Sequence, residues 1–256
     1  MLIDLHVHST HSAGGAFAVR DVVRRARAVG LDGLVFTDLN TLEGLEEIRE
    51  AAREEQFVAL CGVELVTDRG HYLCYFPDPS KVPAPPQVFG TTPWPVRDVL
   101  RTVVERGGVV VAAHPYDKTI DRPSGDFIFT LDGLSAVEGL NARCSGAAND
   151  LAVEAADHMN LPCVAGSGAH GNLDDLGRVA TLFREPVTDE AGLVAQLRAG
   201  GVYCVTIGAV PQPQSRDSRP PPSRGPRRDR DEPRRSSRGG DRRGGDRRGP
   251  PRGGRR

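Results

Sequence analysis

Short β-branched runs alternate with amphipathic stretches along residues 1–210, and this alternation limits the folds that the chain can adopt. The runs MLIDLHVH (1–8) and GVVVAAHP (108–115) are typical of buried strands. The stretches VRDVVRRARAVG (19–30) and VRDVLRTVVERG (96–107) carry apolar residues at helical spacing and end in glycine, a common helix stop. Alternating strands and helices predict an α/β fold with a largely parallel sheet.

Further runs of the same two kinds continue this pattern to residue 207. The other expected strands are 32–38, 57–65, 71–76, 134–141, 161–170 and 202–207, and the other expected helices are 42–55, 147–160 and 189–200. Roughly six to eight strand–helix units of this size suit a barrel near the lower size limit for such folds. The active site of such a barrel lies where the strands run out into the following loops.

Polar side chains interrupt the apolar strands close to the points at which those strands end. They are His6, His8, Asp38, Glu64, His114, Asn141 and His170. A single histidine in such a place is usually a structural residue that hydrogen bonds satisfy. Because six of the seven histidines fall in or beside strand ends, we interpret the group as a metal centre.

His6 and His8 are separated by one residue in an apolar run. Side chains two positions apart on a strand point to the same face, so both imidazoles can reach one ion. Imidazole and carboxylate ligands suit Zn²⁺, Mn²⁺ or Fe²⁺. A metal in such a site lowers the pKa of bound water to about 7 and polarises a phosphoryl oxygen. Glu64 is the natural candidate for a carboxylate that bridges two ions.

Six motifs together resemble one known family. They are IDLHVHSTHS, FTDLNTLEG, CGVEL, HYLCYF, AAHP and VAGSGAHGNLDDLG. In order and spacing they are similar to the PHP (polymerase and histidinol phosphatase) family, over about residues 1–206. The resemblance implies a distorted (β/α)7 barrel of the PHP type. It also implies up to three metal ions and hydrolysis of a phosphomonoester or phosphodiester by metal-bound hydroxide.

The resemblance groups the expected ligands into three metal sites. The first would use His6, His8 and Glu64, the second Glu64, His71 and His114, and the third only His170. Three protein ligands and a water molecule are a normal open coordination for catalytic zinc. We therefore expect one or two divalent ions (Zn, Mn or Fe) rather than three.

Three ligand positions of the family pattern are substituted in this chain. Ala13 and Gly168 stand where the family has acidic ligands, and Leu39 stands where it has a histidine. Alanine and leucine cannot coordinate a metal. Replacement ligands could come from His11 or from residues 174–175; alternatively, His11 lies on the surface and the two aspartates begin a helix, where acidic residues are favoured.

Several of these residues are candidates for catalytic and substrate-binding roles. Glu64 would bridge the ions, and His170 could bind the leaving group or act as an acid. Asp38 is expected to orient a ligand histidine, with a surface-loop role as the alternative. Arg143, close to Asn141, could meet the phosphate of a phosphorylated small molecule or nucleotide, or be an ordinary surface arginine.

The composition changes at Pro211. The whole chain has a formal net charge of −1, but residues 211–256 contain sixteen arginines and six acidic residues. Such a segment has too little apolar area to offset its ordering entropy. We therefore divide the chain into a PHP-like barrel domain, 1–210, and a disordered Arg/Gly/Pro/Asp-rich tail, 211–256. The tail could bind RNA or another polyanion non-specifically, or act as a solubilising or self-associating segment.

The sequence is compatible with two functions. One is a metal-dependent phosphoesterase with a reduced metal centre. The other is a catalytically impaired PHP-fold protein that binds a ligand or partner and engages nucleic acid through its basic tail. No apolar run approaches the roughly 18 residues of a membrane span, and the five cysteines include no CxxC spacing. We expect reduced thiols, no membrane association and a cytoplasmic location.

Overall fold

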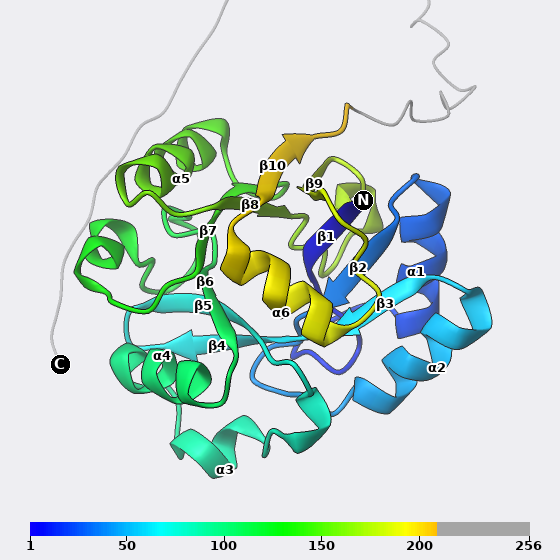
Figure 1. Ribbon diagram of the computed structural model, residues 1–256, viewed down its shortest axis with the longest axis horizontal. Coiled ribbons are helices and arrows are strands. Elements are labelled where there is room, and N and C mark those ends of the chain that lie inside the picture. The colour runs from blue at the N-terminus through cyan, green and yellow to red at the C-terminus, as the bar shows by residue number, and fades with distance from the viewer. Residues whose placement is uncertain (209–256) are drawn as a thin grey trace, which may run out of the picture. The chain divides into compact units, whose positions relative to one another are not determined.

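The computed structural model describes residues 1–208 (Figure 1). The strands are β1 (Leu2–Val7), β2 (Gly33–Phe36), β3 (Val58–Cys61), β4 (Val63–Thr67), β5 (Gly70–Tyr75), β6 (Val109–Ala112), β7 (Ala136–Asn141), β8 (Cys163–Gly166), β9 (Val179–Phe183) and β10 (Val202–Thr206). The helices are α1 (Val19–Ala28), α2 (Leu45–Glu55), α3 (Pro85–Phe89), α4 (Val96–Glu105), α5 (Gly146–His158) and α6 (Glu190–Ala199). The predicted tail and the predicted domain boundary at residue 210 lie outside the described residues.

The strands form two five-stranded sheets. The first sheet has the order β10–β9–β1–β2–β3, and the second has the order β4–β5–β6–β7–β8. Four neighbouring pairs are parallel and four are antiparallel. The predicted mixture of strands and helices is confirmed. The expectation of a largely parallel sheet is wrong, and the strands of residues 1–208 do not close into one hydrogen-bonded barrel.

The break between the sheets falls inside the predicted strand 57–65. The chain leaves the first sheet after β3 and enters the second at β4, with Gly62 between them. A Cβ atom at Gly62 would lie 2.6 Å from Cδ1 of Tyr75, so a side chain does not fit at this crossing. Two isolated β-bridges join the edges of the two sheets. One pairs Leu39 with Glu64, and the other pairs Val7 with Ala169. The two sheets therefore meet beside several of the polar residues that the sequence analysis singled out.

Helix α6 packs into the core that the two sheets share. Its Leu193 and Leu197 are fully buried in the same cluster as Leu5 of the first sheet and Val111 of the second. Burial of a leucine side chain stabilises a fold by about 1.5–3 kcal/mol. Figure 1 shows α6 near the centre, with α1 and α2 on one side and α4 and α5 on the other. This core fixes the position of the two sheets relative to each other, and the polar residues that lie between the sheets depend on that position.

The outer helices bury one apolar stripe each. In α1 the buried residues are Val19, Val22, Val23 and Ala26, which is the spacing of one helix face. They pack with α2 against the outer side of β2. Within residues 1–208, no helix combines the length and the apolar character that a membrane span requires.

Candidate metal centre

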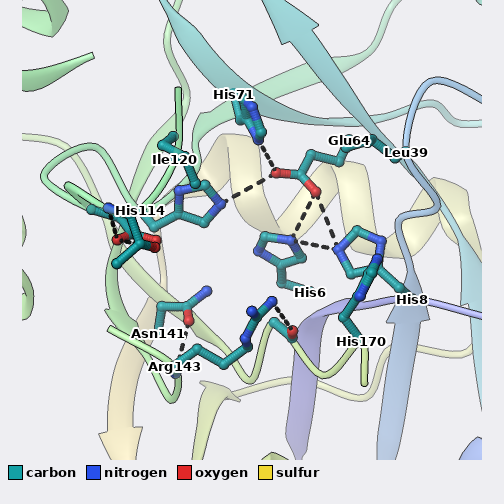
Figure 2. Close-up of a pocket in the computed structure, with 13 residues that line it drawn as sticks. His6, His8, Leu39, Glu64, His71, His114, Ile120, Asn141, Arg143 and His170 are labelled. Atoms are coloured by element: carbon teal, nitrogen blue, oxygen red, sulfur yellow. Dashed lines mark hydrogen bonds and ion pairs between the residues drawn. The ribbon is translucent and has the colours of Figure 1, made fainter. Parts of the chain in front are cut away.

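A pocket of about 220 Å³ brings together most of the residues that the sequence analysis singled out (Figure 2). It opens beyond the ends of β1, β6, β7 and β8. Its lining includes His6, His8, Leu39, Glu64, His71, His114, Asn141, Arg143, Gly168 and His170, together with Asp117, Thr119 and Ile120. Segments far apart in the sequence thus place their polar side chains around one cavity.

Each oxygen of Glu64 faces two imidazoles. Oε2 lies 3.2 Å from Nε2 of His6 and 3.1 Å from Nε2 of His8. Oε1 lies 2.7 Å from Nδ1 of His71 and 3.2 Å from Nε2 of His114. Figure 2 shows Glu64 between the two pairs. One carboxylate placed between two pairs of imidazoles is an arrangement suited to a bridge between two cations.

The donor atoms fit metal ions. Nε2 of His6 and Nε2 of His8 lie 3.1 Å apart and approach the same oxygen of Glu64, so their lone pairs can converge on one cation. Nδ1 of His114 is buried and has no hydrogen-bond partner among the described residues. Two groups with ligand atoms within 4.8 Å of one another match the first two expected sites: His6, His8 and Glu64, and Glu64, His71 and His114.

Neighbouring charges shift the pKa values of the cluster. Burial would raise the pKa of Glu64, but the charge of His6 and hydrogen bonds from three histidines hold it well below its ordinary value. Burial would lower the pKa of His6, but the carboxylates of Glu138 and Glu64 outweigh burial and raise it well above 6.5. Burial lowers the pKa of His8. Glu64 therefore stays ionised, and its negative charge favours a cation between the imidazoles.

Two buried carboxylates beside the cluster received no role from the sequence. Glu138 is 1% exposed, and its Oε1 lies 2.9 Å from Nδ1 of His6. Asp4 is fully buried, and its Oδ1 accepts the backbone N–H groups of His6 at 3.1 Å and Ser167 at 2.8 Å. Each of them is a charged residue inside an apolar strand, which is the feature that identified Glu64 in the sequence.

Asp38 does not have the expected contact with a ligand histidine. Its Oδ1 accepts the backbone N–H of Ser9 at 2.6 Å, and its Oδ2 accepts the hydroxyl of Ser9 at 2.7 Å. Nδ1 of His8 lies instead 3.0 Å from Oγ of Ser12. Asp38 therefore fastens the turn that follows β1 and does not line the pocket. Sequence position alone could not show which neighbour this carboxylate meets.

The residues at the third expected metal site do not form a ligand group like those at the first two sites. Leu39 contributes an apolar side chain to the pocket. Nε2 of His170 lies 3.0 Å from the carbonyl oxygen of Ala13, and its ring stands edge-on to His8 at 5.1 Å. None of the groups that could hold a metal within residues 1–208 includes His170. Its roles as a ligand and as an acid stay predictions.

Asn141 and Arg143 occupy the space next to Gly168. A Cβ atom at Gly168, where φ is +61°, would lie 2.9 Å from Nδ2 of Asn141 and 3.4 Å from Cδ of Arg143. A guanidinium N–H of Arg143 donates to the carbonyl oxygen of Gly168 at 3.3 Å. A positively charged side chain thus lies where the family pattern would place an acidic ligand.

The candidate replacement ligands lie outside the pocket lining. Nε2 of His11 pairs with Oε2 of Glu47 at 2.7 Å. Asp174 pairs with Arg25 and Asp175 with Arg178, each at 3.3 Å. These contacts agree with the alternative of a surface position for His11, and the two aspartates lie in the short 3₁₀ helix Leu173–Asp175.

Comparison with known families decides the relationship. Residues 4–138 match the family described as PHP domain, and residues 146–202 match the family described as PHP-associated. The chain belongs to the PHP family. The PHP chain is 29% identical over 164 residues to the uncharacterized protein MJ1587 of Methanocaldococcus jannaschii, a match that covers 60% of this chain and 90% of that protein. It is 38% identical over 65 residues to a 5'-3' exoribonuclease of Haemophilus influenzae, across 25% of this chain and 23% of the relative.

Two solved structures share the PHP fold. One is a protein of Bifidobacterium adolescentis, proposed to be a metal-dependent phosphoesterase, with a TM-score of 0.57 and 21% identity over 77% of this chain and 96% of that one. The other is an amidohydrolase of Chromobacterium violaceum with bound sulfate and no metal, with a TM-score of 0.59 and 20% identity over 80% of this chain and 98% of that one. At these identities the likeness establishes the fold alone.

Proposed function

We propose that this PHP chain is a phosphoesterase that uses one or two divalent ions to hydrolyse a phosphomonoester or phosphodiester. The observation that carries the proposal is the pair of imidazoles at each oxygen of Glu64. His6 and His8 would hold one ion with Glu64, and His71 and His114 would hold the other. Zn²⁺, Mn²⁺ and Fe²⁺ suit this set of nitrogen and oxygen ligands.

When bound, such ions would lower the pKa of a water molecule and polarise a phosphoryl oxygen. The residues of the pocket would bind and orient the substrate. Arg143 would form charge-assisted hydrogen bonds to phosphate oxygens, and Asn141 lies beside it on the same wall. His170 would donate a proton to the leaving group from its place next to His8. Leu39 would keep one side of the pocket apolar and limit the access of water.

The size and charge of the pocket favour a small phosphorylated group. A cavity of about 220 Å³ with Arg143 on its wall suits a phosphorylated small molecule or one nucleotide. A longer substrate would have to extend out of the pocket. The phosphate would therefore lie between Arg143 and Glu64. The rest of the substrate would extend toward Thr119 and Ile120, which line the same cavity.

The direct test is hydrolysis by the purified chain, supplied with Mn²⁺ or Zn²⁺, of a panel of phosphomonoesters and phosphodiesters. We expect turnover that a chelator removes and added metal restores, and loss of turnover in Glu64→Ala. The matched control is Glu47→Ala, which removes a half-exposed carboxylate that pairs with His11 at the surface. No turnover with either metal, in a protein shown to be folded, would contradict the proposal.

A second candidate function is a catalytically impaired PHP protein that binds a ligand or partner. It is favoured by Leu39 at a family ligand position and by the contact of His170 with the carbonyl of Ala13. This candidate predicts metal and phosphate binding without turnover. The two functions separate if inorganic phosphate binds, as measured by calorimetry, while every ester of the panel remains uncleaved.

The basic tail, 211–256, would engage nucleic acid in this second candidate. Its arginines would neutralise phosphates, so the affinity would fall steeply with salt. The measurement is binding of a labelled RNA oligonucleotide to the full chain at two salt concentrations. The control replaces the sixteen tail arginines with glutamine. Equal affinity for both proteins would exclude the tail as the RNA-binding segment.

A further inference from the structure

Glu138 is a buried carboxylate that belongs to neither pair of imidazoles around Glu64. It lies on β7 in the second sheet and is 1% exposed. Its Oε1 lies 2.9 Å from Nδ1 of His6, which belongs to β1 in the first sheet. A carboxylate so far from water persists only where hydrogen-bond donors surround it. The donors around Glu138 therefore determine which atom holds the proton between it and His6.

Two partners of Glu138 are groups that can only donate. Its Oε2 accepts the backbone N–H of His114 at 2.8 Å, and its Oε1 accepts Nδ2 of Asn141 at 3.2 Å. The amide of Asn141 is oriented at its other end, where Oδ1 accepts the backbone N–H of Arg143 at 3.0 Å. Because Asn141 donates to Oε1 and His114 to Oε2, Glu138 faces its neighbours as a hydrogen-bond acceptor. The hydrogen between Glu138 and His6 then belongs to Nδ1 of His6.

We propose that Glu138 is a positioning residue that keeps a proton on Nδ1 of His6 and thereby directs the lone pair of Nε2 toward His8 and Glu64. The proposal rests on the proposed metal-dependent function, because it concerns how one metal ligand is oriented. A carboxylate behind a metal-binding histidine generally sets the tautomer and ring orientation of that histidine and makes it a more basic ligand.

The same carboxylate also holds a ligand from the other pair. His114 has a φ of +27°, a backbone conformation that residues other than glycine adopt rarely and only where contacts hold them. Its N–H donates to Oε2 of Glu138. One side chain of the second sheet thus restrains a histidine from β1 and a histidine that follows β6.

The local backbone allows Glu138 to reach His6. The register of β7 against β8 shifts between Glu138 and Leu140, and an irregularity of this kind changes the direction of nearby side chains. Gly166 on β8 leaves the necessary space. A Cβ atom there would lie 2.3 Å from Cβ of His6 and 2.9 Å from Oε1 of Glu138. The contact between Glu138 and His6 therefore lies beside a register shift in β7 and a glycine in β8.

An alternative is that Glu138 binds a metal directly. Ligand atoms of His6, His114 and Glu138 lie within 4.8 Å of one another and form a third group that could hold an ion. In that case Nδ1 of His6 would bind the metal and carry no proton. The two readings therefore place the proton of His6 on different nitrogens, and this difference can be measured.

Long-range ¹H–¹⁵N correlation spectra of the full-length protein, labelled with ¹⁵N-histidine, locate this proton. The spectra are recorded on metal-free and zinc-loaded protein, and the His6 signals are assigned by their loss in His6→Ala. We expect a proton on Nδ1 of His6 in both forms. A His6 ring in the zinc-loaded protein with its proton on Nε2 would overturn the proposal and favour direct ligation by Glu138.

A variant tests whether Glu138 causes this arrangement. In Glu138→Gln we expect the Nδ1 proton signal of His6 to move upfield and exchange faster, and zinc affinity to fall about 10- to 100-fold in chelator competition. Glu154→Gln removes an exposed carboxylate of α5 and should change neither quantity. A folded Glu138→Gln with unchanged His6 signals and zinc affinity would overturn the proposal.

The spectra of the wild-type protein do not depend on Glu138→Gln, so they decide the question even where that variant does not fold. They also separate this proposal from the proposed function. Absence of phosphoester hydrolysis would contradict the function and leave the position of the His6 proton to be read independently. A misplaced proton would contradict the role of Glu138 whether or not the protein hydrolyses esters.

Discussion

Oε2 of Glu64 lies 3.2 Å from Nε2 of His6, although Glu64 belongs to β4 and His6 to β1, in different sheets. The candidate metal centre is therefore assembled across the seam between the sheets. Any change that moves one sheet against the other would separate ligands that belong to the same ion.

Replacement of Glu64 by glutamine should remove metal from both candidate sites. The carboxylate supplies one oxygen to each pair of imidazoles, and a neutral amide lacks the charge that favours cations there. Since loss of a partner behind a ligand costs 10- to 100-fold in affinity, we expect loss of this shared ligand to cost at least about 100-fold. Chelator competition measures the affinity. Glu47→Gln serves as the control, and equal metal binding by both variants would contradict a bridging role.

Asp4 should make the stability of the metal-free protein depend on pH. Burial raises its pKa from 3.8 to about 6, and its Oδ2 has no hydrogen-bond partner among the described residues. A group whose pKa is higher in the folded state contributes stability that is fully present below about pH 3.8 and is lost as the pH rises through about 6. A shift of this size corresponds to about 3 kcal/mol.

Asp4→Asn removes this titration. The stability of the variant relative to the wild type should therefore rise by up to about 3 kcal/mol between pH 4 and pH 7.5. Urea unfolding of both proteins at the two pH values measures the difference. Asp132→Asn, at an exposed position, is the control. A difference that stays constant with pH would show that Asp4 does not titrate in this range.

Gly166→Ala should disturb the seam between β8 and β1. The added Cβ would lie 2.3 Å from Cβ of His6, so one of the two strands must move. Overpacking of this kind costs about 1–3 kcal/mol, and we expect zinc affinity to fall with stability. Gly146→Ala is the matched control, because nothing lies within 4 Å of a Cβ at that position. Equal effects of the two substitutions would exclude a tight contact at Gly166.

The sequence predicts the elements of this fold better than their assembly. The alternation of strands and helices located most of the elements, yet it could not show that Gly62 divides one apolar run between two sheets. At that division a side chain would meet the ring of Tyr75, which lies at the end of β5, the strand that pairs with β4. The sequence analysis missed the short strand β9 (Val179–Phe183) because its residues show no clear periodicity of apolar side chains. Its antiparallel pairing with β1 depends on tertiary contacts, which the local sequence does not determine.

For the candidate site, the sequence likewise predicted the residues better than the contacts between them. Residue type and spacing identified the histidines and Glu64, because charged and imidazole groups in apolar strands are conspicuous. The contact of Asp38 with Ser9 and the contact of Glu138 with His6 join residues 29 and 132 positions apart. Such pairings depend on strand register, which local periodicity does not determine. Family resemblance gave no role to Glu138, so its place beside His6 emerged only from the structure.

Arg143 should bind the phosphate of the substrate without affecting metal content. Loss of a hydrogen bond to a charged group costs about 1.5–3 kcal/mol, so we expect Arg143→Gln to raise KM about 10- to 100-fold. Inorganic phosphate should inhibit this variant more weakly by a similar factor. Arg178→Gln removes an arginine that pairs with Asp175 outside the pocket and is the control. An unchanged KM together with a lower metal content would assign Arg143 a structural role.

Glu64 and its four histidines would hold one or two ions that support hydrolysis. The most direct measurement is metal analysis by mass spectrometry of the full chain, purified without chelator, with phosphoester hydrolysis followed on the same sample. We predict one or two divalent ions per chain, and activity that disappears with the metal and returns with it. A folded chain that retains no metal, and that neither binds added Mn²⁺ or Zn²⁺ nor hydrolyses a phosphoester with them, would contradict this role of Glu64 and the histidines.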